Sequence, residues 1–364
     1  MGDFNTEIYT WYAANRRDLP WRETGDPYKI WLSEIILQQT RVAQGLTYYL
    51  RFVEKFPTVS DLATAPEDEV LKLWQGLGYY SRARNLHAAA KYIDKELNGI
   101  FPSAYESIHA LKGVGEYTAA AIASFAFHLP HAVVDGNVFR LLARYFGISE
   151  PIDTGAGKKL FRKLAGELVP PGNPALHNQA MMEFGALQCV PVKPACLLCP
   201  LQTGCFAHSN KLVGYFPVRN RKSVARNRYF NYFVIFSGSS VFLKRRKEKD
   251  IWKNLFEFPL VETKNEISAK EIIGGKEVSS LLSGFLEMKL ERVTDWKKHL
   301  LSHQKIIYRF FILQVEKEKK ISSGLIKVEK KDIFNFAVPK LVESFINNSK
   351  LFSLMIPVYV LFFQ

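Results

Sequence analysis

The sequence predicts a multidomain chain in which an all-helical part is followed by a part that mixes strands and helices. The chain has 364 residues, more than one ordinary domain holds. Hydrophobic residues make up 48% of it, enough for packed cores and too many for a mainly disordered chain. The spacing of these residues changes from a helical to a strand-like pattern, and this change separates the two parts.

The first part, residues 1–209, is expected to be helical because apolar residues recur there at intervals of three and four. Its clearest helices are predicted at 69–76, 81–98 and 118–127. A basic segment with proline and glycine, 210–228, is interpreted as a linker. In the second part, 229–364, strands are predicted at 229–236, 241–244, 256–261 and 306–315, with helices at 266–273 and 339–347.

The charge balance points to a polyanionic partner. Lysine and arginine outnumber aspartate and glutamate by 49 to 35, a net charge of +14, and residues 226–364 alone carry 25 basic and 15 acidic side chains. No apolar run reaches the roughly 18 residues of a membrane span, since Ser353 and Pro357 interrupt the apolar stretch 351–363. The N-terminus has no positively charged, apolar leader, so we expect no membrane and no secretion.

The four cysteines of the chain are all confined to one short segment. Cys189, Cys196, Cys199 and Cys205 follow the spacing C-x6-C-x2-C-x5-C, and such clustering indicates metal ligation in a reducing cytoplasm rather than disulfides. A structural zinc site usually pairs two CxxC elements, and only one is present. An iron–sulfur cluster tolerates wider spacing and is the preferred interpretation, with zinc or four unrelated cysteines as alternatives.

A glycine-rich segment, Leu111 to Ala120, joins two helical stretches. Gly113 and Gly115 let the backbone turn tightly, and the helix that follows presents unpaired N–H groups and a positive dipole end. This arrangement suits a DNA phosphate and carries no base specificity. An ordinary loop remains the alternative.

Two carboxyl groups are candidates for breaking an N-glycosidic bond, which requires one group to protonate the leaving base and another to stabilise a cationic sugar. Asp135 is predicted to cap a helix, where N–H donors and the dipole favour its ionised form. Glu34 has helix neighbours such as Ile30 and Trp31, and this apolar setting would raise its pKa. Local sequence leaves open a plain helix cap and a surface glutamate.

Three segments favour the catalytic interpretation of both residues by resemblance: YKIWLSEIILQQT at 28–40, LWQGLGYYSRARN at 73–85 and AVVDGNVFR at 132–140. They closely resemble the adenine DNA glycosylases, part of the endonuclease III-like helix-hairpin-helix superfamily, over nearly the whole chain and most strongly from Trp11 to Cys205. The resemblance implies removal of adenine opposite 8-oxoguanine or guanine in double-stranded DNA, and a 4Fe-4S cluster held by the four cysteines. It assigns adenine protonation to Glu34 and cation stabilisation, or covalent trapping, to Asp135.

Tyr117 occupies the position at which bifunctional relatives carry a lysine that forms a Schiff base. Because a tyrosine cannot form an imine, we expect a monofunctional enzyme that uses water, with Tyr117 and Asn137 positioning the water or Asp135. A bifunctional pyrimidine-lesion glycosylase/lyase is the rival enzyme, and a non-enzymatic iron–sulfur redox sensor that binds DNA is the rival of another class. Tyr117 could also merely pack.

Further residues match family positions that bind DNA or the base. Adenine must be flipped out of the duplex. The resemblance places Gln39, Thr40 and Tyr79 in the vacated stack or at the opposite base, with Gly113 and Gly115 at the backbone. Trp21, Arg22 and Gln179 are expected to line the adenine pocket, although each aromatic residue could equally be core.

The second part resembles the Nudix-like domain of the same family. Phe256 to Pro259 matches its WEFP element, but no magnesium-binding glutamate cluster follows, so we expect a binding module rather than a hydrolase of sugar nucleotides. The family's Phe-Ser-His reader of 8-oxoguanine stands here as Leu301, Ser302 and His303, which lacks the aromatic residue. We expect a monomer that acts on DNA in the cytoplasm, at the nucleoid.

Overall fold

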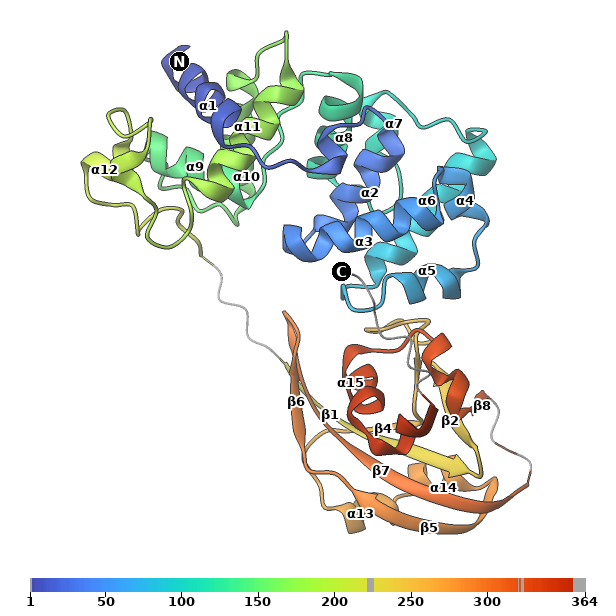
Figure 1. The fold of residues 1–364 in the computed structure, drawn as a ribbon. Coiled ribbons are helices and arrows are strands. Elements are labelled where there is room, and N and C mark those ends of the chain that lie inside the picture. The colour runs from blue at the N-terminus through green and yellow to red at the C-terminus, as the bar shows by residue number, and fades with distance from the viewer. Residues whose placement is uncertain (1, 221–225, 320, 322–323, 356–364) are drawn as a thin grey trace. The chain divides into compact units, whose positions relative to one another are not determined.

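The computed structural model describes residues 2–220, 226–319, 321 and 324–355. The chain forms two compact units. The first, here the helical unit, comprises Met1–Thr64 and Asn85–Lys222, and the second, the sheet unit, comprises Ala65–Arg84 and Ser223–Gln364. Figure 1 shows the helices of the first unit and the sheet of the second. Each unit has its own hydrophobic core.

The helical unit consists of helices joined by short turns, as the periodicity predicts. Its elements are α1 (Gly2–Asn15), η1 (Pro20–Arg22), α2 (Pro27–Leu37), α3 (Val42–Lys55), α4 (Val59–Thr64), α6 (Ser81–Glu96, which begins in the sheet unit), α7 (Tyr105–His109), α8 (Glu116–Phe127), α9 (Gly136–Phe146), α10 (Gly155–Leu168), α11 (Pro174–Leu187), η2 (Cys196–Leu198) and α12 (Phe206–Ser209). The expected helices at 81–98 and 118–127 are therefore confirmed as α6 and α8.

Two helices at the centre of the helical unit carry the sequence motifs. The carboxylate of Asp26 caps α2 by accepting from the backbone N–H of Tyr28 at 2.9 Å, and Pro27 starts the helix without losing a hydrogen bond. Helix α2 packs against α8, which is apolar on nearly every face and is buried for most of its length. Helix α11 packs against α1, α8 and α9, so it links the two halves of the unit.

The sheet unit contains an eight-stranded mixed sheet. The strands are β1 (Arg226–Ser237), β2 (Ser240–Arg245), β3 (Phe256–Glu257), β4 (Leu260–Thr263), β5 (Phe285–Val293), β6 (Lys297–Leu300), β7 (Gln304–Glu318) and β8 (Leu325–Glu329). The main order is β3-β2-β1-β7-β5, with β4 on β1, β6 on β7 and β8 on β2. Strands β1 and β7 run parallel, and the remaining pairs are antiparallel.

Helices cover both faces of this sheet (Figure 1). The faces alternate along β1: Phe233 stacks on Phe311 in the core shared with α13 (Ala269–Ile273) and α14 (Lys276–Leu282). On the opposite face Phe310 stacks on Phe345 of α15 (Lys340–Asn348), with ring centroids 3.9 Å apart. Helix α5 (Glu67–Leu73) and two 3-10 helices, η3 (Lys330–Asn335) and η4 (Lys350–Met355), complete the unit.

The strands predicted at 229–236, 241–244 and 306–315 are confirmed as parts of β1, β2 and β7, and the helix at 69–76 corresponds to α5. The strand predicted at 256–261 is interrupted between β3 and β4, where Pro259 has no N–H to donate. The expected linker divides: Val213 and Phe216 contact the helical unit through Arg144, whereas Arg226 already belongs to β1. Residues 221–225 between them lie outside the described residues.

Across the described residues, no helix combines the length and the apolar character that crossing a membrane would require.

Candidate functional site

A cavity of about 780 Å³ opens in the helical unit between α2, α8, α9 and α11. Residues from four separate stretches of sequence line it. They include all four residues expected to be catalytic, Glu34, Tyr117, Asp135 and Asn137, and the three expected in the adenine pocket, Trp21, Arg22 and Gln179. Gln39 and Thr40, expected to touch DNA, lie on its rim. The fold therefore brings these nine side chains to one place.

Glu34 projects from the buried side of α2 and has only 6% of its surface exposed. Burial raises the pKa of its carboxyl from an ordinary 4.5 to about 7, because the charged form loses its water. The Tyr117 hydroxyl, which hydrogen-bonds to it, opposes this rise, and the nearby charge of Asp135 adds to it. A carboxyl with this pKa keeps its proton at neutral pH in about half of the molecules and can act as an acid.

Asp135 caps the N-terminus of α9, as the sequence predicts. One carboxylate oxygen accepts from the backbone N–H groups of Asn137 and Val138, each at 2.8 Å, and the other accepts from the Asn137 side chain at 2.7 Å. Burial nevertheless raises the pKa of Asp135, and these hydrogen bonds only moderate the rise. The cap therefore favours the ionised form, as the sequence indicates, while desolvation acts in the opposite direction and is the larger of the two effects.

Tyr117 lies at the start of α8, with its hydroxyl against Glu34. Burial, together with the two neighbouring carboxyl groups, raises the pKa of Tyr117 well above its usual value. The phenol therefore stays protonated and donates its hydrogen bond. Asn137 is held in turn by Arg140, whose guanidinium donates to the Asn137 amide oxygen at 2.9 Å.

One charged residue of this cavity escapes the sequence reasoning. Glu183 of α11 is 1% exposed and receives hydrogen bonds from both Arg17 and Arg22, the latter at 2.8 Å. Burial alone would raise the pKa of Glu183, but the two guanidinium groups outweigh it and lower the value to about 2. An acid between Met182 and Phe184 in an apolar helix was the available signal, of the same kind as that around Glu34.

The same wall orients the amide of Gln179, whose oxygen accepts from the Tyr12 hydroxyl at 3.0 Å. Trp21 is 8% exposed and packs edge-on against Tyr49, so it is both a core residue and part of the cavity lining. At the rim, Gln39 adopts a left-handed backbone with φ of 55°. That conformation is uncommon for a residue other than glycine and is often found at functional sites.

The glycine-rich segment forms a tight hairpin between α7 and α8. Gly113 has a φ of 82°, and a Cβ atom there would lie 2.6 Å from the Cβ of Asn85, so only glycine fits. Gly115 is the N-cap of α8 and offers no side-chain cap. The first N–H groups of α8 consequently remain available to a partner at the surface.

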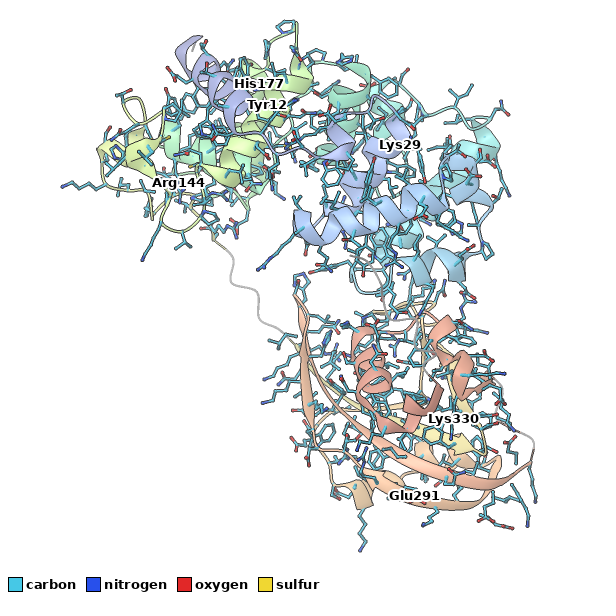
Figure 2. All side chains as sticks on the ribbon, in the orientation of Figure 1. Tyr12, Lys29, Arg144, His177, Glu291 and Lys330 are labelled. Carbon is cyan, nitrogen blue, oxygen red and sulfur yellow. The ribbon has the colours of Figure 1, made fainter. Side chains whose placement is uncertain are left out.

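The four cysteines line one small cavity of about 30 Å³, together with Arg144 of α9. Arg144 is labelled in Figure 2. Arg144 is 3% exposed and donates to the Cys189 sulfur at 3.4 Å and to several backbone carbonyls of the same loop. Among the described side chains, no three His, Cys, Asp or Glu residues are arranged to hold one metal ion. Four thiols facing a shared space are compatible with a larger, multi-atom centre.

A second cavity, of about 570 Å³, lies within the sheet unit. Leu301, Ser302 and His303 line it in the turn between β6 and β7, and Tyr79 lines it from the loop that follows α5. The Tyr79 hydroxyl contacts the Ser302 hydroxyl. The residues expected to read a lesion are thus gathered here. Tyr79 belongs to the sheet unit, and the other residues expected to contact DNA, such as Gln39 and Thr40, belong to the helical unit.

Comparison with known proteins identifies both parts of the chain. Residues 32–171 match the family described as HhH-GPD superfamily base excision DNA repair protein, and residues 231–348 match the NUDIX domain. Together with the mixed sheet and the helical unit, these matches confirm the fold class expected from the sequence.

Similar proteins are found among both sequences and structures. The adenine DNA glycosylase of Buchnera aphidicola subsp. Baizongia pistaciae (strain Bp) is 36% identical over 302 residues, covering 82% of this chain and 83% of the relative. The adenine DNA glycosylase of Rattus norvegicus is 46% identical over 215 residues, covering 56% of this chain and 42% of the relative. The solved structure of a thermostable thymine-DNA glycosylase superposes with a TM-score of 0.54 at 34% identity, covering 57% of this chain and 95% of that chain.

Proposed function

Because the chain belongs to the adenine DNA glycosylases, a family of base-excision repair enzymes, we propose that it hydrolyses the N-glycosidic bond of adenine mispaired with 8-oxoguanine or guanine in duplex DNA. One observation carries this proposal: Glu34 and Asp135 line the same cavity and have different hydrogen-bond surroundings. Two carboxyl groups of this kind can divide acid and anion roles between them.

The reaction would proceed with adenine flipped into the cavity of the helical unit. Glu34 donates its proton to a ring nitrogen of adenine, which lets the base leave as a neutral molecule while the sugar becomes cationic. Asp135, held by three hydrogen bonds, presents its carboxylate to that cation. A water molecule then adds to the sugar carbon and gives up a proton, which the Glu34 carboxylate takes back to restore the acid, and Asn137 would position that water.

Adenine recognition would depend on the arginines and the amide on the opposite wall. Arg22 and Arg17 are held by Glu183, and the Gln179 amide is held by Tyr12. Groups fixed in this way keep their donors and acceptors in place for the edge of the base, and this preorganisation favours one base over another. Trp21 offers an aromatic surface beside them.

Tyr117 supports a monofunctional enzyme over a bifunctional lyase. Its phenol has no amine to attack the sugar and is engaged with Glu34. Borohydride trapping on DNA that contains an abasic site tests this point. The wild-type protein should give little covalent adduct, whereas strong trapping would favour the lyase.

The four cysteines fit a 4Fe-4S cluster, which we propose as the resident cofactor. Cys189, Cys196, Cys199 and Cys205 supply four soft thiolate donors around one space. The cluster would tie the ends of their loop together, and Arg144 would provide positive charge beside its anionic thiolates. Metal analysis of anaerobically purified protein tests this assignment and distinguishes it from zinc.

DNA would be held by its backbone and read at the lesion. The hairpin of Gly113 and Gly115 presents the N-terminus of α8 to a phosphate. Gln39, Thr40 and Tyr79 would fill or border the position that adenine vacates, and Ser302 would contact the oxidised edge of 8-oxoguanine, with Leu301 and His303 beside it. We propose that one chain suffices for these tasks and that the protein acts as a monomer.

Single-turnover release of adenine tests the whole proposal. Duplexes that carry adenine opposite 8-oxoguanine, guanine or thymine should rank in that order, and equal rates for all three would overturn the specificity. Glu34→Gln should slow release by about 10²- to 10⁴-fold while DNA binding persists. Unchanged release would remove Glu34 from the mechanism, and no release by the wild-type protein would favour a DNA-binding redox sensor.

A further inference from the structure

The cavity of the sheet unit is larger than a contact surface for one edge of a base requires. Its volume of about 570 Å³ falls within the roughly 300–1,000 Å³ typical of small-molecule sites. Three stretches far apart in the sequence line it, residues 76–84, 250–252 and 299–304, together with Lys340 of α15. It is therefore a formed pocket within one unit.

The backbone around this pocket is unusual. Tyr79 and Trp252 both line the pocket and adopt left-handed conformations, with φ of 46° and 58°. Residues with side chains rarely occupy this region, and those that do cluster at ligand sites. Trp252 also packs against His299, with ring centroids 6.2 Å apart. The pocket thus has aromatic walls that the local fold holds in place.

Polar groups in the lining can recognise the edge of a purine. The Ser302 hydroxyl both donates and accepts, and the amide oxygen of Gln304 is engaged by Arg228 at 3.1 Å, so Gln304 offers its NH₂ group. Burial lowers the pKa of His299, which keeps its imidazole neutral and able to accept as well as donate. An 8-oxopurine presents an N–H and a carbonyl side by side, and such a set of groups can satisfy both.

Positive charge stands beside these groups. Arg84 lines the pocket and donates to the Lys253 carbonyl at 2.8 Å, and the negative charge of Glu67 lies near enough to oppose the lowering of the Arg84 pKa by burial. Lys340 also lines the pocket, and its ammonium group forms an ion pair with the Glu343 carboxylate at 2.8 Å. Asp250, the acid of the lining, is neutralised by Arg228 and Arg246. The remaining charge suits a phosphate.

From this combination we propose that the sheet unit binds a free 8-oxopurine nucleoside monophosphate, with the base between Tyr79 and Trp252 and the phosphate on Arg84. The inference rests on the proposed reading of 8-oxoguanine and extends it from a lesion in DNA to the mononucleotide. A nucleotide in this pocket would compete with a lesion-bearing duplex for Ser302, so the level of oxidised nucleotides would regulate lesion binding.

The free protein keeps this site partly closed. The Tyr79 hydroxyl is hydrogen-bonded to the Ser302 hydroxyl, so a ligand must break this contact to reach the serine. Removing only that hydroxyl, in Tyr79→Phe, leaves the aromatic wall intact and should strengthen nucleotide binding by about two- to tenfold, the range that one hydrogen bond is worth. Removing the serine hydroxyl, in Ser302→Ala, should weaken binding by a similar factor.

Isothermal titration of the full chain with 8-oxo-dGMP tests the proposal. Binding of one equivalent should be measurable at about millimolar concentrations or below, tighter than that of dGMP and of inorganic phosphate, and weakened about tenfold by Arg84→Ala. Ser279→Ala, an exposed serine of α14 outside the pocket, is the matched control and should bind as the wild type does. A competition assay should show that 8-oxo-dGMP displaces a duplex containing adenine opposite 8-oxoguanine.

The outcomes separate this inference from the proposed function. No binding of 8-oxo-dGMP, or equal binding of 8-oxo-dGMP, dGMP and phosphate, would overturn the inference even if adenine release still prefers 8-oxoguanine as the opposite base. If 8-oxo-dGMP binds selectively but adenine release shows no preference for 8-oxoguanine as the opposite base, the inference about the pocket holds and the proposed reading of DNA is overturned. If Arg84→Ala does not fold, Tyr79→Phe and Ser302→Ala still decide the matter, because each removes one hydroxyl.

Discussion

The buried carboxyl of Glu34 couples the stability of the helical unit to pH. Folding raises the pKa of this group from 4.5 to about 7, so the native protein binds the proton more tightly than the unfolded chain does. The resulting stabilisation is complete below pH 4.5 and is lost as the pH rises through about 7. At about 1.4 kcal/mol per pKa unit, the loss approaches about 3 kcal/mol.

The substitution Glu34→Gln replaces the ionisable group with a neutral one of the same shape that can still accept from Tyr117. At pH 5 the wild type has lost less than about 1 kcal/mol of this stabilisation, so the two proteins should unfold within about 4 °C of each other. At pH 8 the variant should be more stable by up to about 3 kcal/mol, a difference of roughly 6–12 °C in Tm for a unit of this size. Exposed Glu54 of α3 provides the control, since Glu54→Gln removes a carboxyl that water already solvates.

Thermal unfolding between pH 5 and pH 8, followed by fluorescence and by circular dichroism, measures this difference. A Glu34→Gln variant that is less stable than the wild type at pH 8, or a stability gap that does not change with pH, would refute the buried-acid interpretation. The adenine-release rate of the wild type should fall over the same range, about tenfold per pH unit above pH 7, because the proton donor is lost.

Three further outcomes are expected. Asp135→Asn should keep the cap of α9 but slow adenine release by roughly 10²- to 10³-fold in single-turnover assays, because a neutral amide does not stabilise the cationic sugar, and a rate within tenfold of the wild type would contradict this role. Glu183→Ala should destabilise the helical unit by about 3–5 kcal/mol, since Arg17 and Arg22 lose their buried partner. Denaturant unfolding measures this change, and a loss of unfolding free energy below about 1 kcal/mol would contradict the structural role of Glu183. Cys199→Ser should reduce the iron content of the purified protein, and full iron occupancy would show that this cysteine is not a ligand.

Sequence patterns were strongest where one residue type is required for a local reason. Asp135 was predicted as a cap because it follows two valines and precedes a helical pattern, and the geometry of α9 confirms it. Gly113 was predicted to make a tight turn, and the space beside Asn85 admits no side chain. Such features depend on neighbours in the chain, so a sequence contains enough information to predict them.

Features that depend on distant partners could not be predicted in this way. Strands β5 and β6 are rich in charged residues and largely exposed, so their sequences lack the apolar runs that mark β1 and β7, and only pairing with β7 defines them. The burial of Asp135, which raises the pKa of its carboxyl, could not be predicted either, because it depends on helices from elsewhere in the chain. The sequence also does not indicate that Trp252 lines the same pocket as Tyr79 and Ser302, because these residues are brought together by the fold.

Desolvation acts on both catalytic carboxyl groups, so it cannot by itself assign one as the acid and the other as the anion. The difference between them lies in their donors: Asp135 accepts three hydrogen bonds at the positive end of α9, whereas Glu34 has the hydroxyl of Tyr117. Donors of this kind lower the pKa of a carboxyl, and the groups share one cavity, where ionising both would bring like charges together. Glu34 therefore retains the proton, and this order follows from a helix terminus that the sequence Val-Asp-Gly-Asn-Val already specifies.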